Sequence, residues 1–264
     1  MKSEKLKSAL WAILALITLV VLLSLLNSPP NKDRAKPGFK KNAVRIETPK
    51  GKKMVGDVYL PAKPGKTDSA RFPGAVLLAP AFETREIYAP LAIELSQHGV
   101  AVLSVELIPA KKRNSGKSFN PQEIGDLPMD AWAAVNYFKQ RPEIDSTKLA
   151  ILGTELTGRS ALIAASLNPH IKGVVLVSAV LDSTGFRIIR MSPQLPVLVM
   201  VSLQDGPAGF QAKSIYEASQ NPNSDIESYI NAGRGAEIWW SQARLELTQY
   251  IANWLEKKVF KLSS

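Results

Sequence analysis

The stretch Lys148–Ser160 combines a potentially reactive side chain with the backbone elements that would hold it. Leu149–Leu152 is a short, wholly apolar run followed by a glycine, which is typical of a strand buried on both faces of a parallel sheet. A helix-forming run begins at Gly158, so Glu155 falls in a sharp turn between strand and helix. A carboxylate in such a turn could attack a substrate as a nucleophile. Ser160 lies about one helical turn further on, and we expect it to be a helix-surface or helix-packing residue.

The residue types that usually supply thiol, disulfide or metal chemistry are scarce. The chain of 264 residues contains no cysteine, which excludes disulfides, thiolate nucleophiles and cysteine-bound zinc. The two histidines, His98 and His170, leave little room for a histidine-based metal site. Each precedes an expected strand, so we interpret both as turn or capping residues. The sequence therefore predicts neither a metal site nor a cofactor.

Positive charge is concentrated at the N-terminal end of the chain. Residues 1–66 hold 14 Lys and Arg against four acidic residues, a net charge of +10, whereas the remaining residues hold 19 of each sign. The basic residues flank an apolar segment, and this placement favours contact with anionic lipid headgroups over nucleic acid. We expect no nucleic-acid partner.

The apolar segment Ala9–Leu26 has the length of a membrane anchor. Its eighteen residues carry no charge, and as a helix they would span roughly 27 Å, enough for a hydrocarbon core. No small-x-small cleavage site follows, so an uncleaved anchor is favoured over a cleaved signal peptide. Lysines lie on both sides of the segment and make its orientation ambiguous. Because long domains translocate largely regardless of charge, we expect the globular part to be extracytoplasmic.

The predicted organisation has three parts: an anchor over residues 1–27, a linker over residues 28–42 and a single domain over residues 43–264. Pro, Lys and Asn dominate the linker. Apolar residues make up 45% of the whole chain, which is enough to supply a core for this domain. It opens with two antiparallel strands, Ala43–Thr48 and Lys53–Leu60, joined by a turn.

After this hairpin, strands and helices alternate, which indicates a doubly wound α/β fold with a mostly parallel sheet. The expected strands are Gly74–Leu78, Val100–Val105, Leu149–Leu152, Val174–Val177, Pro196–Val201 and Ile226–Ile230. The expected helices are Glu86–Gln97, Asp130–Gln140, the run from Gly158, Ala208–Ser219 and Gln242–Lys258. The short connection Ala179–Gln194 leaves no room for a large lid.

This order of elements resembles the α/β-hydrolase fold, and most nearly the dienelactone-hydrolase-like esterases. The resemblance covers about Ala43 to Lys258 and is carried by the stretches Pro73–Pro80, Leu91–Leu103 and Ile151–Gly158. The last of these matches the G-x-S-x-G nucleophile elbow of the family, with Glu155 at the serine position and Thr157 at the second glycine.

The resemblance also implies where the remaining catalytic residues should lie. The acid is expected just after the strand Pro196–Val201, where Asp205 stands, and the histidine in the Gly-rich turn Asn231–Ala236, where Arg234 stands. Arginine is always protonated and cannot accept a proton, so it cannot replace the histidine as a base. The equivalents of the oxyanion donors are the backbone N–H groups of Ala81 and Leu156, beside a Pro80 that has none.

The sequence therefore predicts a membrane-anchored, non-catalytic hydrolase-like domain that binds a protein or small-molecule ligand. Two alternatives remain open: an esterase-class serine hydrolase with its catalytic residues elsewhere, and a hydrolase that uses Glu155 as a carboxylate nucleophile. A sharper hypothesis concerns the altered triad. If Arg234 lies between Glu155 and Asp205, its guanidinium would join both carboxylates in an ion-pair network.

Overall fold

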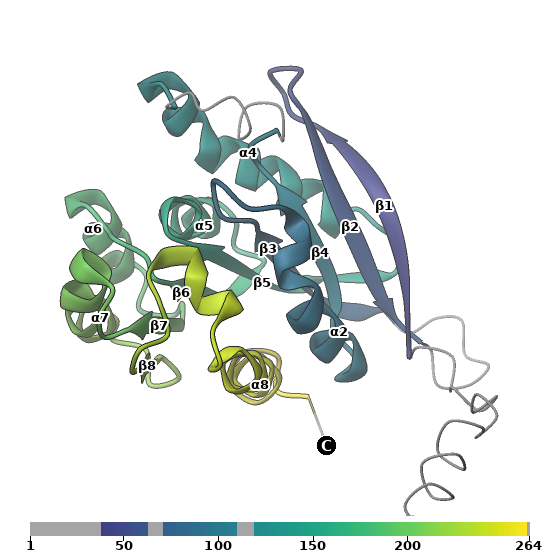
Figure 1. Ribbon diagram of the computed structural model, residues 1–264. Helices are drawn as coiled ribbons and strands as arrows, with labels where there is room; N and C mark the ends of the chain where they lie inside the picture. The colour runs from purple at the N-terminus through teal and green to yellow at the C-terminus, as the bar shows by residue number, and fades with distance from the viewer. Residues whose placement is uncertain (1–37, 63–70, 110–118, 263–264) are drawn as a thin grey trace, which may run out of the picture. The chain divides into compact units, whose positions relative to one another are not determined.

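The computed structural model describes residues 38–62, 71–109 and 119–262, all of which belong to one compact unit. Eight strands of this part of the chain form a single sheet in the order β1-β2-β4-β3-β5-β6-β7-β8 (Figure 1). The strands are β1 Phe39–Glu47, β2 Lys53–Pro61, β3 Phe72–Leu78, β4 Ala101–Glu106, β5 Ile144–Thr154, β6 Ile171–Val177, β7 Val197–Ser202 and β8 Asp225–Tyr229. The helices are α2 Ala89–Gln97, α4 Pro121–Lys139, α5 Leu156–Ser166, α6 Ser183–Met191, α7 Gly206–Ala218 and α8 Arg244–Trp254, with the shorter turns η1 Arg85–Tyr88, η2 Gly235–Trp240 and η3 Leu255–Phe260.

The sheet is mostly parallel, as the sequence predicts. Only the pairings of β2 with β1 and with β4 are antiparallel. The strand β5 lies between β3 and β6, and its Ile151 pairs with Val76 on one side and Val174 on the other. The prediction that the Leu149–Leu152 strand is central is confirmed.

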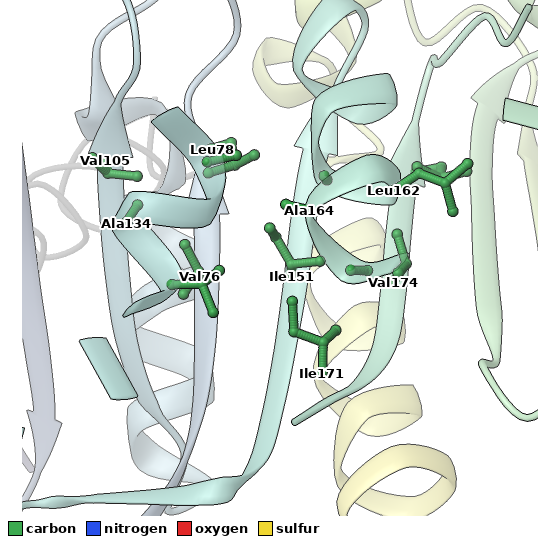
Figure 2. Packing of buried hydrophobic residues seen from close by; sticks show 14 of the residues in the cluster. Val76, Leu78, Val105, Ala134, Ile151, Leu162, Ala164, Ile171 and Val174 are labelled. Carbon is green, nitrogen blue, oxygen red and sulfur yellow. The ribbon is translucent and has the colours of Figure 1, made fainter. Parts of the chain in front are cut away.

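Helices cover both faces of the sheet because alternate side chains of each strand point to opposite sides. On β5, Ile151 packs into the cluster that receives α4, α5, α6 and α7, whereas Leu152 packs into the cluster of α2 and α8. Figure 2 shows part of the first cluster, where Val76, Ile151 and Val174 from three neighbouring strands lie beneath helical residues such as Leu162. Each fully buried aliphatic side chain of this kind contributes about 1.5–3 kcal/mol to folding.

Several elements differ from the sequence expectations. The strand β1 begins at Phe39, inside the predicted linker. Most of its side chains are exposed at the edge of the sheet, and the resulting polar composition is similar to that of a linker. The helix α4 begins at Pro121 rather than Asp130 because Asn120 and Glu123 form a capping box, although Pro128 lies inside the helix. The connection Ala179–Gln194 contains α6, whose first turn is capped by the Asp182 carboxylate.

The predicted anchor Ala9–Leu26 and most of the predicted linker lie outside the described residues. Within the described ranges, no helix combines the length and the apolar character needed to cross a membrane.

Candidate functional site

Glu155 is held in a strained turn between β5 and α5. Its φ and ψ angles are 54° and −121°, a region that non-glycine residues seldom adopt and that costs about 1–3 kcal/mol. The turn is fixed from both sides, since the Glu155 N–H donates to the Val177 carbonyl at 3.0 Å and its carbonyl accepts from the Gly158 N–H at 3.0 Å. The expected positive φ at Glu155 is confirmed.

Glycines make this turn sterically possible. A Cβ on Gly153 would overlap the Thr157 carbonyl, and a Cβ on Gly158 would lie 2.8 Å from the Ala179 Cβ. Thr157 replaces a glycine of the elbow pattern without opening the turn. Its Oγ1 accepts from the Thr154 N–H at 3.0 Å and lies 3.1 Å from the Leu78 carbonyl oxygen, to which it can donate.

A buried hydrogen-bond chain supports the elbow from beneath. The Trp239 indole N–H donates to the Thr154 Oγ1 at 3.0 Å, and that hydroxyl lies 2.7 Å from the Tyr88 hydroxyl, which donates to the Leu78 carbonyl at 3.1 Å. The Tyr88 hydroxyl uses its one proton on the Leu78 carbonyl, so the Thr154 hydroxyl is the donor to Tyr88. This chain ties the end of β5 to η1, η2 and the end of β3.

The structure brings Glu155 and Asp205 to the same short segment of backbone. The Gly235 N–H donates to Asp205 Oδ2 at 2.9 Å, and the next N–H, of Ala236, donates to the Glu155 carboxylate. Gly235 has φ +54°, and a Cβ built on it would fall on Glu155 Oε1. The loop backbone, not a side chain, therefore lies between the two carboxylates.

Arg234 does not join them. Its side chain is exposed and makes no ion pair with any carboxylate of the described residues, while its N–H donates to Glu237 Oε2 at 2.9 Å. The hypothesis of a Glu155–Arg234–Asp205 ion-pair network is therefore wrong. Each carboxylate receives one backbone N–H instead, and an exposed guanidinium avoids the desolvation cost of a buried pair.

The electrostatic surroundings of Glu155 are acidic. Burial raises the pKa of the Glu155 carboxyl, and the negative charges of Asp205, Glu83 and Glu237 act in the same direction. The hydrogen bond from the Ala236 N–H opposes this shift only in part. No cation of the described chain pairs with Glu155 within ion-pair distance.

The oxyanion-loop equivalents lie at the same edge of the sheet. Ala81 is buried in the loop after β3, and Leu156 is the first residue of α5, where a backbone N–H has no partner within the helix. The loop with Ala81 is anchored by Arg85. Its guanidinium forms ion pairs with the buried carboxylates of Asp57 and Glu106, each at 3.0 Å.

Neither histidine can serve this site. His170 immediately precedes β6, whereas Glu155 bonds to Val177 at the far end of that strand. The seven residues of β6 correspond to about 20 Å. His98 caps the C-terminal end of α2, before β4, and its Nδ1 lies 2.7 Å from Glu256 Oε2. Ser160 is buried in α5 with its Oγ 3.4 Å from the Leu156 carbonyl, in the helix-packing role expected of it.

A pocket of about 340 Å³ opens beside the elbow. Its lining residues are Glu155, Leu156, Arg159, Ser178, Val180, Asp205, Pro207, Ala208 and Gly235. Ser178 was not singled out from the sequence. It directly follows β6 with φ 48° and is only 3% exposed. Its one sequence signal is its position after a buried strand, which many structural residues share.

Comparisons with solved structures show the fold. A dienelactone hydrolase from Anabaena variabilis is 19% identical, with a TM-score of 0.69 over 84% of this chain and 99% of that one. An esterase from the archaeon Pyrobaculum calidifontis is 15% identical, with a TM-score of 0.61 over 90% and 87%. Est1E from Butyrivibrio proteoclasticus is 13% identical, with a TM-score of 0.64 over 82% and 98%. No protein-family model matches the sequence.

Proposed function

We propose that this chain, whose fold is the α/β-hydrolase fold in its dienelactone-hydrolase-like form, is a membrane-anchored domain that binds a ligand without hydrolysing it. Residues 9–26 would contact membrane lipid, and the globular part would lie outside the cytoplasm. The ligand would occupy the pocket at the carboxyl edge of the sheet, where ligands of open α/β sheets bind.

One observation carries the non-catalytic part of this proposal. The backbone of Gly235 and Ala236 lies between Glu155 and Asp205 and donates a hydrogen bond to each carboxylate. A serine-hydrolase relay needs a proton acceptor at this point, next to the nucleophile and oriented by the acid. Two N–H donors cannot accept a proton, and the exposed Arg234 has no basic nitrogen to offer.

Exposed apolar side chains at the carboxyl edge of the sheet support a binding role. Large apolar side chains in the loops after β3, β6, β7 and β8 are exposed, although such side chains are usually buried. They are Phe82, Val180, Leu203 and Ile230, with exposed fractions of 66%, 44%, 55% and 72%. Exposed apolar groups gathered at one edge favour a surface that contacts a ligand or partner.

The two alternatives have weaker support. A serine hydrolase would need a histidine near a serine of the pocket, and both histidines lie at the opposite edge of the sheet. A carboxylate nucleophile would form an ester on Glu155 that an activated water must then hydrolyse. The described residues offer no neutral imidazole beside Glu155 to activate that water.

Labelling with a serine-reactive fluorophosphonate tests the proposal. We expect no labelling of the full chain, and labelling after Glu155→Ser is combined with either Arg234→His or Gly235→His. The second combination is suggested by the structure, because the Glu155→Ser change removes the side-chain atoms that crowd residue 235. Strong labelling of the unmodified chain, lost when the protein is heat-denatured, would overturn the proposal in favour of a serine hydrolase.

A further inference from the structure

The pocket beside the elbow contains a polar group whose bonding is incomplete. The Ser178 Oγ is buried and has no hydrogen-bond partner anywhere in the described residues. Burying a hydroxyl without a partner is unfavourable, and the left-handed backbone of Ser178 adds strain. The Ser178 N–H is used by the fold, since it donates to the Met200 carbonyl at 2.8 Å. The hydroxyl is therefore the side-chain group at this position that remains without a partner in the described residues.

Two carboxylates line the same pocket and leave acceptor capacity unused. Glu155 and Asp205 each receive one backbone N–H, whereas a carboxylate offers about four acceptor positions. Neither forms an ion pair with a cation of the described chain. The arginine in the lining, Arg159, is already paired with Asp182 at 2.9 Å. The polar part of the lining therefore presents acceptors with net negative charge.

The remaining lining is apolar. Leu156, Val180, Pro207 and Ala208 form the walls, which suit a hydrocarbon or aromatic body better than a hydrated ion. A divalent metal would need several oxygen ligands around one point, and no cluster of three or more metal-ligating side chains occurs among the residues that the structure describes.

We infer that this pocket binds a primary ammonium group attached to a short apolar body, with Glu155, Asp205 and the Ser178 hydroxyl as its three acceptors. An ammonium has three N–H donors, one for each acceptor. Its charge offsets the repulsion between the two carboxylates, and its apolar body packs against the walls. This inference rests on the proposed function, because it names the ligand class of the same site.

The inference requires binding to depend on pH. Protonation of Glu155 removes one negative charge, so affinity for an ammonium falls as the pH falls through the pKa of the Glu155 carboxyl. That pKa is raised by burial and by the nearby charges of Asp205, Glu83 and Glu237. Arg159, which is paired with Asp182, lines the pocket, and the exposed Arg234 lies next to its Gly235; both stay protonated throughout.

Calorimetric titration of the full chain tests the inference with three probes of one shape: benzylammonium, benzyl alcohol and benzoate. We expect benzylammonium to bind at least about tenfold more tightly than the other two, because hydrogen bonds from a charged donor to carboxylates are stronger than those between neutral groups. Nα-acetyl-lysine amide, as a further probe, distinguishes a lysine side chain from a free amine as the natural source. Equal binding of the three benzyl probes would overturn the inference, as would tighter binding of calcium alone that is lost in Glu155→Gln.

Variants locate the binding. We expect Glu155→Gln, Ser178→Ala and Ser178→Gly each to weaken benzylammonium binding about tenfold or more. The two Ser178 variants remove the same hydroxyl but differ in backbone strain, so a shared loss of affinity cannot come from misfolding of one of them. Glu217→Gln, an exposed site on α7, is the charge-matched control and should bind as the unmodified chain does. Unchanged affinity in both Ser178 variants would contradict the assignment.

Ester turnover on the same preparation separates the two claims. Turnover would refute the non-catalytic function whatever the titration shows. A lack of turnover together with no preference for benzylammonium would refute only the ligand class.

Discussion

The Oε1 atom of Glu155 occupies the space that a Cβ on residue 235 would need. The position of the Glu155 side chain therefore depends on the absence of a side chain at residue 235. With serine at position 155, as in the elbow pattern, the space next to residue 235 would be open to a side chain. With Glu155 present, glycine leaves room for the carboxylate beside the loop, whereas a larger residue would require the Glu155 side chain to shift away from the Ala236 N–H.

This dependence predicts a coupling in stability between residues 155 and 235. Gly235→Ala should cost about 2–3 kcal/mol, because alanine disfavours the φ of +54° and forces Glu155 away from its hydrogen bond. In a Glu155→Ala background the same change should cost only about 1–2 kcal/mol, the left-handed strain alone. Urea unfolding of the four chains of this double-mutant cycle measures the difference. Strictly additive costs would show that the two residues do not contact each other.

Glu155 also predicts a pH-dependent stability difference. The folded-state pKa of Glu155 is raised above its usual value, chiefly by burial, so the folded protein binds its proton more readily than the unfolded chain. Ionisation of Glu155 therefore destabilises the fold, and this cost grows as pH rises from the unfolded pKa through the folded one. Glu155→Gln should be more stable than the unmodified chain at neutral pH.

The stability difference between Glu155→Gln and the unmodified chain should shrink as pH falls below the usual glutamate range. Thermal unfolding of the two chains between pH 4 and pH 8 makes the comparison. A Glu155→Gln chain that is less stable than the unmodified chain at neutral pH would mean that the ionised carboxylate is stabilised by its surroundings.

Two arginines should respond very differently to truncation. Arg234→Ala should change the free energy of unfolding by less than about 0.5 kcal/mol, because the side chain is exposed and unpaired within the described residues. Arg85→Ala should cost about 2–4 kcal/mol, because it removes the ion pairs to the buried Asp57 and Glu106. Chemical denaturation provides both values. A larger effect at Arg234 than at Arg85 would restore the ion-pair network that the structure argues against.

Much of the fold could be predicted because its signals are local. The buried strand before Glu155, the sharp turn and the following helix all depend on hydrophobic runs and on Gly153 and Gly158. The parallel sheet follows from the alternation of strands and helices. The start of α4 at Pro121 was missed because Pro128 normally marks a helix boundary, and here the capping box at Asn120 outweighs it.

The site was only partly predictable, because its decisive contacts join residues far apart in the chain. The strained turn at Glu155 could be read from the neighbouring glycines. The role of Gly235 could not, because it depends on the approach of a loop 80 residues away in sequence. Opposite charges suggest that Arg234 pairs with Glu155 and Asp205, but the backbone N–H groups of the same loop donate hydrogen bonds to those carboxylates instead. Ser178 became notable only when its hydroxyl was found to lack a partner.

The central claim is that Glu155 binds and does not catalyse. The most direct measurement is the hydrolysis of a short-chain p-nitrophenyl ester by the purified full chain and by its Glu155→Gln variant, over a range of pH. The account predicts the same rate for both proteins, equal to that of the buffer alone. A rate above the buffer that the Glu155→Gln change abolishes would contradict it and would make Glu155 a catalytic residue.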